Sequence, residues 1–156
     1  MKKNHSTILL ILTLTCAILF SNTHTAEAVT TSRWYTKAVS FKKIEKAAKE
    51  KEQPYILFFY TNWCGYCKRM KRKYLSNTEV KKILSKYYRI KINPDTGRAE
   101  QTLAREKGAQ GYPDFRIIYP NGKSIRIHPF QRNGSVKVAE FIKELKAMLT
   151  LKGQTQ

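Results

Sequence analysis

Cysteine and histidine are scarce in this chain, which has three of each among 156 residues. Only Cys64 and Cys67 form a close pair. The other residues of these two types are scattered: Cys16, His5, His24 and His128. Four-coordinate zinc needs two more cysteine or histidine ligands at suitable spacing, and no second pair supplies them. The sequence therefore argues against a zinc site, and we expect neither a metal nor another cofactor.

Long hydrophobic runs are also lacking. The apolar run from Ile8 to Phe20 falls short of the ~20 residues that a membrane-spanning helix needs. Two lysines precede it and Ala26-Glu27-Ala28 follows it, which is the pattern of a secretory signal peptide. We predict that residues 1–28 are a cleaved signal peptide and that residues 29–156 form one periplasmic or otherwise extracytoplasmic domain. The alternative is an uncleaved N-terminal anchor.

Acidic residues are few, with 11 Asp and Glu against 30 Lys and Arg, so the formal net charge is +19. Most of these cations are expected on solvated helix faces. They can also attract an anionic surface, such as membrane headgroups, an acidic protein or a polysaccharide. Nucleic acid is not expected as a partner, because no recognition motif is present and the leader directs the chain elsewhere.

The most informative stretch is Trp63-Cys64-Gly65-Tyr66-Cys67-Lys68, which follows the apolar run Ile56–Tyr60 and precedes a helix-forming segment. A C-x-x-C sequence between a strand and a helix is typical of redox sites. If the helix begins at Cys64, its sulfur lies at the positive end of the helix dipole, where the thiolate is favoured. Cys67 then lies one turn further on, within reach of a mixed disulfide at Cys64. Two other interpretations remain open at this point: half of a zinc site, and a purely structural disulfide.

Hydrophobic periodicity predicts alternating helices and strands. Helices are expected over residues 36–53, 64–75 and 98–107, from Asn77 onward, and from Gly134 onward; strands are expected over 55–60, 87–92, 115–119 and 125–128. Asn121-Gly122 between the last two strands indicates a hairpin. Strands joined by helical crossovers must be parallel and the hairpin antiparallel, so we predict an α/β fold with a central mixed sheet flanked by helices on both faces.

This order of elements resembles the thioredoxin fold over nearly all of residues 29–156. The marks of the resemblance are the cysteine motif and Gly111-Tyr112-Pro113. The resemblance implies a Cys64–Cys67 disulfide, with Cys64 as the attacking and Cys67 as the buried resolving cysteine, and Trp63 shielding the pair. It also implies that Pro113 is cis and that Tyr112 offers its backbone to an extended substrate. The remaining residues that we expect to contact substrate are Gly65 and Tyr66.

Two of these assignments have plainer alternatives: core packing for Trp63 and an ordinary trans proline for Pro113. His128, at the end of the last strand, is a further candidate for a place near the site, but we interpret it as an ordinary strand-end histidine. The sequence also departs from the family pattern. Phe58 stands where protein-reducing thioredoxins carry a buried aspartate, the usual proton acceptor for the resolving cysteine. The dipeptide between the cysteines resembles that of bacterial periplasmic disulfide isomerases.

The resulting functional prediction is an extracytoplasmic thiol–disulfide oxidoreductase. It would act on protein disulfides or dithiols as a monomer and depend on a redox partner that recycles its cysteines. Reduction or isomerisation is favoured over oxidation, because no histidine lies between Cys64 and Cys67. The alternative is a redox-inert basic binding module for an anionic partner or a membrane surface.

Overall fold

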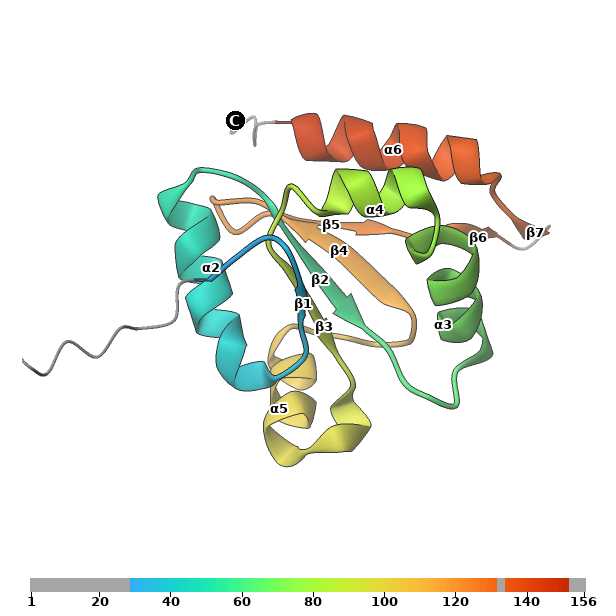
Figure 1. Ribbon diagram of the computed structural model, residues 1–156. Helices are drawn as coiled ribbons and strands as arrows, with labels where there is room; N and C mark the ends of the chain where they lie inside the picture. Colours follow the sequence, from blue (N-terminus) through green and yellow to red (C-terminus); the bar gives the residue numbers. More distant parts are fainter. Residues whose placement is uncertain (1–28, 132–133, 152–156) are drawn as a thin grey trace, which may run out of the picture.

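A five-stranded mixed sheet lies at the centre of the protein, in the order β1-β3-β2-β4-β5 (Figure 1). The computed structural model describes residues 29–131 and 134–151. The strands are β1 Trp34–Tyr35, β2 Tyr55–Phe59, β3 Arg89–Ile92, β4 Asp114–Ile118 and β5 Ser124–Ile127. β3 is parallel to β1 and β2, whereas β4 is antiparallel to β2 and β5. The predicted mixed sheet is thus confirmed; the predicted signal peptide, residues 1–28, lies outside the described residues.

Helices cover both faces of the sheet. They are α2 Phe41–Glu50, α3 Gly65–Arg69, the π-helix η2 Met70–Leu75, α4 Thr78–Leu84, α5 Arg98–Glu106 and α6 Val138–Thr150, with short 3₁₀ turns η1 Ala38–Ser40 and η3 Pro94–Thr96. Within the described ranges, none of these helices has the length and apolar character to span a membrane.

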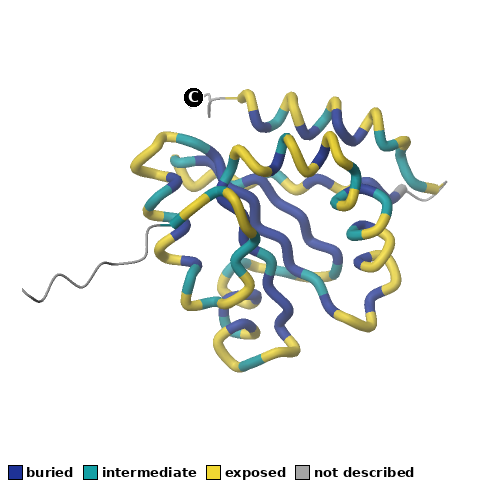
Figure 2. Tube along the Cα trace, in the orientation of Figure 1, coloured by how far each residue is buried: buried dark blue, intermediate teal, exposed yellow. Residues whose placement is uncertain are grey.

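The strand β2 is buried along its whole length (Figure 2) and divides the core between the two faces. Successive side chains of a strand point to opposite faces. Ile56 and Phe58 accordingly join the cluster beneath η2, α4 and α6, whereas Leu57 and Phe59 join the cluster beneath α2 and α5. The continuous apolar run that predicted a strand buried on both faces is confirmed. This rigid strand ends next to the cysteine motif.

A buried ionic cluster holds the start of β4. The Asp114 carboxylate is only 2% exposed and accepts hydrogen bonds from the guanidinium groups of Arg116 and Arg126. Arg116 also donates to the carbonyl oxygens of Lys107 and Gly108 at the end of α5, at 2.6 and 3.0 Å. Strand β4 is thereby tied to α5 immediately after Pro113.

Two of the predicted helix starts are wrong. The segment that was expected to form one helix from residue 36 has a 3₁₀ turn first, and its α-helix starts at Phe41. Gly134–Ser135 was expected to open the last helix but forms strand β7, paired with β6 Phe130–Gln131. The helix begins only at Val138, because Glu140 accepts a hydrogen bond from the backbone N–H of Lys137 and fixes the start there. Strand β1 was not predicted at all.

Glu100 of α5 gives one prediction about stability and pH. Its buried carboxylate accepts the backbone N–H of Ala38 at 3.1 Å, and this hydrogen bond lowers the pKa of Glu100 while burial opposes the shift. A folded-state pKa below the unfolded value means that the stabilisation is complete above about pH 4.3 and is lost as pH falls through the folded pKa. We expect Glu100→Ala to cost about 1–2 kcal/mol at neutral pH and much less in acid.

Urea unfolding at several pH values measures this difference. The matched control is Glu106→Ala on the same helix, because Glu106 is exposed and its loss should cost less than about 0.5 kcal/mol at any pH. A cost for Glu100→Ala that does not change between neutral and acidic pH would contradict the role given to its charge.

Candidate functional site

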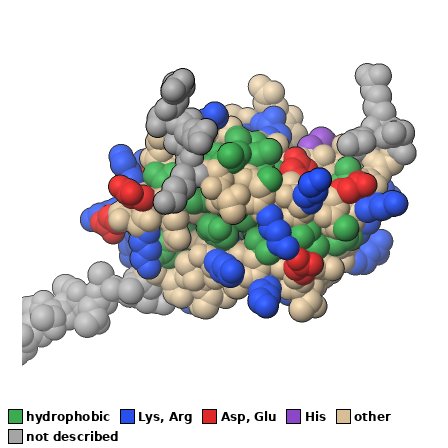
Figure 3. Space-filling view, turned by 90° about the horizontal axis from the view of Figure 1, so that it is seen from above, with side chains coloured by type: hydrophobic (Ala, Val, Ile, Leu, Met, Phe, Trp, Pro, Cys, Tyr) green, Lys and Arg blue, Asp and Glu red, His purple; other side chains and the backbone are tan. Residues whose placement is uncertain are grey.

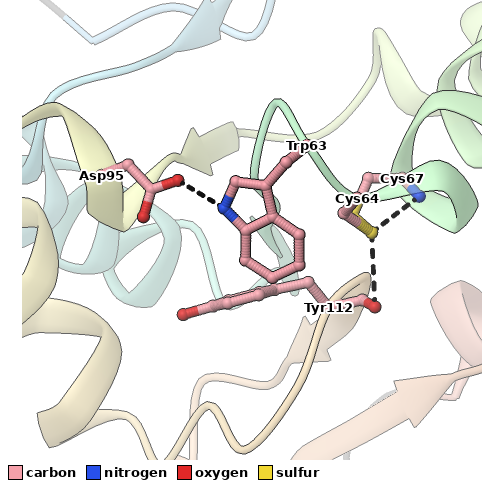
Figure 4. The surroundings of a disulfide bond; sticks show 5 residues. All are labelled: Trp63, Cys64, Cys67, Asp95 and Tyr112. Carbon is pink, nitrogen blue, oxygen red and sulfur yellow. Dashed lines mark hydrogen bonds between the residues drawn. A yellow bond between two sulfur atoms is a disulfide. The ribbon is translucent and has the colours of Figure 1, made fainter.

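The cysteine pair lies at the start of helix α3, which follows β2 after a short loop. Cys64 and Cys67 form a disulfide with their Cα atoms 5.2 Å apart. Cys64 is the N-cap residue of α3, and its Sγ accepts a hydrogen bond from the backbone N–H of Cys67 at 3.0 Å (Figure 4). The prediction that the helix begins at Cys64 is confirmed. The position favours a negative sulfur, because unpaired N–H groups and the helix dipole point at it.

The two cysteines differ in their exposure to solvent. Cys67 is completely buried, whereas Cys64 is 6% exposed. A nucleophile must reach its target, so only Cys64 is placed to attack a disulfide from outside. Cys67 is placed to react with Cys64 alone. This asymmetry fits the attacking and resolving roles that the resemblance implied.

The chain before β4 forms the other side of the site. The Tyr112–Pro113 peptide bond is cis, as the resemblance implied, and the trans alternative is wrong. The carbonyl oxygen of Tyr112 lies 3.4 Å from Cys64 Sγ (Figure 4), so a reduced Cys64 thiol can donate a hydrogen bond to it. Burial, followed by the charges of Asp95 and Asp114, raises the pKa of the Tyr112 phenol and keeps it neutral.

Trp63 lies on the surface next to this edge. It is 71% exposed, so the alternative that it is a core residue is wrong. Its indole Nε1–H donates to Asp95 Oδ2 at 3.0 Å, and its ring packs edge-on against Tyr112 with centroids 6.3 Å apart (Figure 4). Asp95 belongs to η3, which follows β3. The contact thus joins the ends of two neighbouring strands to the start of β4.

Tyr66, between the cysteines, is a second exposed aromatic residue of the site. It is 57% exposed and packs on Phe130 of β6 with centroids 5.1 Å apart. Phe130 in turn contacts His128 and, in the core, Tyr74. His128 is exposed at the end of β5, where the strand-end interpretation placed it. The paired strands β6 and β7 therefore contact Tyr66 through Phe130.

Sequence reasoning missed Asp95 and Phe130. A signal for Asp95 was available, because it follows a strand that runs parallel to β2, and parallel strands end at the same edge of a sheet. No local signal marked Phe130, since a two-residue strand carries too little periodicity to recognise.

Phe58 of β2 occupies the sequence position of the absent aspartate. It is fully buried, and its ring stacks on Tyr60 with centroids 5.4 Å apart. In the part of the chain that the structure describes, the two buried carboxylates are those of Glu100 and Asp114, and both are engaged elsewhere. Over residues 29–131 and 134–151, no group of three or more His, Cys, Asp or Glu side chains gathers as a metal site.

Trp63 gives a prediction that separates site geometry from stability. We expect Trp63→Phe to slow reaction of the protein with a disulfide peptide by about twofold to tenfold, because the ring loses its anchor on Asp95. Unfolding free energy should change by less than about 1 kcal/mol, since the hydrogen bond is exposed. Stopped-flow exchange and thermal unfolding measure the two effects. Asp95→Asn keeps a weaker acceptor, so its exchange rate should fall between those of the unaltered protein and Trp63→Phe. A loss of unfolding free energy that accompanies the slower exchange in both variants would contradict a positioning role.

Both the fold and the disulfide site identify the class of this protein. The thioredoxin-like domain family matches residues 41–149, most of the chain, and the protein belongs to this family.

Comparison with particular proteins agrees. The chain is 36% identical over 83 residues to a spinach chloroplastic F-type thioredoxin, covering 53% of this chain and 40% of that one. It is 30% identical over 102 residues to the thiol:disulfide interchange protein DsbD of Neisseria meningitidis, covering 64% and 16%. It spans less than half the length of these two curated relatives. A solution structure of a thioredoxin from Thermus thermophilus superposes with a TM-score of 0.57 at 26% identity, covering 80% of this chain and 92% of that one.

Proposed function

We propose that the protein is a thiol–disulfide oxidoreductase that exchanges disulfides with other proteins through Cys64 and Cys67. The observation that carries the proposal is the asymmetric pair, with Cys64 6% exposed at a helix start and Cys67 completely buried. The disulfide lies beside a cis-proline edge where Tyr112 can offer backbone groups to an extended chain. Relatives named as thioredoxins, disulfide isomerases and a thiol:disulfide interchange protein support it.

The reaction runs in two balanced steps. The reduced Cys64 thiolate attacks one sulfur of a substrate disulfide; the substrate S–S bond breaks, and the other substrate sulfur leaves as a thiolate that takes up a proton. The Cys67 thiol then loses its proton and attacks Cys64 Sγ, which releases the second substrate thiol. Two electrons have passed from the pair to the substrate, and the Cys64–Cys67 disulfide is the product. A dithiol partner protein restores the reduced pair by the same chemistry in reverse.

Within this class we propose reduction or isomerisation rather than oxidation. No histidine lies between the cysteines to stabilise the reduced thiolate, and the intervening dipeptide is Gly65-Tyr66. Phe58 provides no carboxylate to accept the proton of Cys67, so we expect resolution of the mixed disulfide to be slow. We expect the exposed rings of Trp63 and Tyr66 to contact the substrate chain.

The direct test is reduction of insulin disulfides by dithiothreitol with and without the protein, together with the redox potential of the pair. Known pairs on this scaffold range from about −270 mV to about −120 mV, and a potential near the lower value identifies a reductant. Absence of any acceleration of insulin reduction would overturn the proposal. A potential near the upper value would overturn the proposed direction of the reaction.

We also propose that residues 1–28 are removed on export and that the protein works outside the cytoplasm. The support is the sequence pattern of the leader alone. We expect the exported protein to begin at Val29, which N-terminal sequencing of the protein recovered from an extracytoplasmic fraction measures. A protein that keeps its first 28 residues in the membrane fraction would favour the anchor alternative.

A further inference from the structure

The helix that carries the cysteines has an unusual charge. Between Glu52 and Glu79 the chain has no acidic residue. Over the same stretch, α3 and η2 carry five cations, which we call the motif-helix cations: Lys68, Arg69, Lys71, Arg72 and Lys73. Three of them are exposed and two are partly buried.

Elsewhere on the surface, carboxylates accompany the lysines. Over α4 and α6, seen from above in Figure 3, acidic side chains lie among the basic ones, and Lys146 Nζ is 2.6 Å from the Glu79 carboxylate. On α2, Lys42 and Lys46 are paired with glutamates. Across the described part of the chain, no salt bridge involves a motif-helix cation.

The groups next to Lys71 and Lys73 are neutral or positively charged. Lys71 Nζ lies 4.5 Å from the Tyr60 ring centroid, and its pKa is lowered by burial first and then by the charges of Lys91 and Lys68. The Lys73 ammonium donates hydrogen bonds to two neutral oxygens, Ser135 Oγ and the Val136 carbonyl. Like charges held together without a counter-ion favour an anionic ligand.

Two of these cations, Lys68 and Arg69, lie within the first turns of the helix that Cys64 caps. The backbone N–H of Lys68 donates to the carbonyl of Cys64 at 3.1 Å, so Lys68 lies one helical turn beyond the N-cap. The Arg69 guanidinium lies 5.6 Å from the ring centroid of Tyr66, the exposed tyrosine between the cysteines. The carboxylate of Asp95, on the Trp63 side, is already bound to the Trp63 indole.

We propose that the motif-helix cations select disulfide substrates that carry acidic residues next to the disulfide. The inference rests on the proposed function and adds the chemical class of substrate to it. A polypeptide is favoured over a membrane because the cations lie on the helix that Cys64 caps, and Cys64 must come within bonding distance of a second disulfide, which a lipid headgroup does not have. The exchange is the two-step reaction given above; the cations attract the substrate and take no part in bond making.

The experiment uses three peptides that differ only in the residues flanking one internal disulfide, which are glutamates, glutamines or lysines. The pre-reduced protein is mixed with each, and the second-order rate is followed in stopped flow. At about 0.01 M ionic strength we expect the glutamate peptide to react at least about tenfold faster than the lysine peptide. At about 1 M, where the Debye length is only about 3 Å, the ratio should approach one.

Two charge-reversed variants locate the effect. Lys68→Glu/Arg72→Glu changes two exposed motif-helix cations, and Lys43→Glu/Lys49→Glu changes two exposed lysines of α2 on the opposite face of the sheet. Both variants have the same net charge. We expect the first to abolish or invert the preference for the acidic peptide and the second to keep most of it. The glutamine peptide corrects for any change in thiol reactivity, and thermal unfolding verifies that both variants are folded.

The outcomes separate the two proposals. If none of the peptides is reduced, thiol–disulfide exchange itself is wrong. If all three react at the same rate, or if the α2 variant loses the preference as completely as the motif-helix variant, the substrate inference is overturned while the activity stands. Binding to phosphatidylserine vesicles is measured in parallel: vesicle binding that the motif-helix variant loses while its peptide preference is unchanged would identify a membrane partner and overturn the inference.

Discussion

Replacing the buried cysteine, Cys67→Ser, will leave the protein covalently joined to its substrate. Cys64 still attacks a disulfide from the 6% of its surface that is exposed, but nothing can then attack the mixed disulfide from behind. The joined species should persist on a gel run without reductant and disappear when dithiothreitol is added. Mass spectrometry should place the link at Cys64.

The matched control is Cys64→Ser, which keeps the helix start and leaves only the buried sulfur. Because Cys67 is completely buried, this variant should form no covalent complex. Both variants should lose catalysis of insulin reduction, down to the rate of an ordinary thiol in solution. A complex formed by Cys64→Ser through Cys67 would reverse the assigned roles.

Asp114→Asn should be strongly destabilising. Its carboxylate is 2% exposed and forms ion pairs with two guanidinium groups, one of them on the largely buried Arg116. Removing one partner of a buried ion pair leaves the other charge buried and uncompensated, which costs about 3–5 kcal/mol. Urea or thermal unfolding at neutral pH measures this loss.

Arg126→Gln provides the comparison on the same carboxylate. The Arg126 side chain is 49% exposed, so solvent screens its pairing and its loss should cost no more than about 1 kcal/mol. A similar cost for both variants, or a cost below about 1 kcal/mol for Asp114→Asn, would mean that the buried charge is not what secures the start of β4.

Local patterns were sufficient to predict the parts of the site that neighbouring residues build. The run Tyr55–Phe59 predicted a doubly buried strand, and the cysteine spacing predicted a helix with Cys64 at its start. Asn121-Gly122 predicted the hairpin turn, where Gly122 has a φ of 86° that suits glycine. The resemblance, rather than any pattern, supplied the cis bond before Pro113.

The remainder depends on contacts between distant segments, which a local pattern does not encode. The Trp63 indole meets Asp95 32 residues away only because β2 and β3 end side by side. Strand β7 was mistaken for a helix start because its pairing with Phe130 is set by tertiary packing against Tyr66 and Tyr74. The difference in exposure between the two sulfurs likewise follows from the packing around them.

The outermost strands of the sheet matter wherever the protein meets unfolded chains. Such chains present free strand segments, and an open sheet border is a template on which they aggregate. One border here, β1, is only two residues long, and the other, β5, carries the charged Arg126 and is followed within two residues by Pro129. Both features discourage strand addition, so neither border of the sheet is a template on which another chain aggregates.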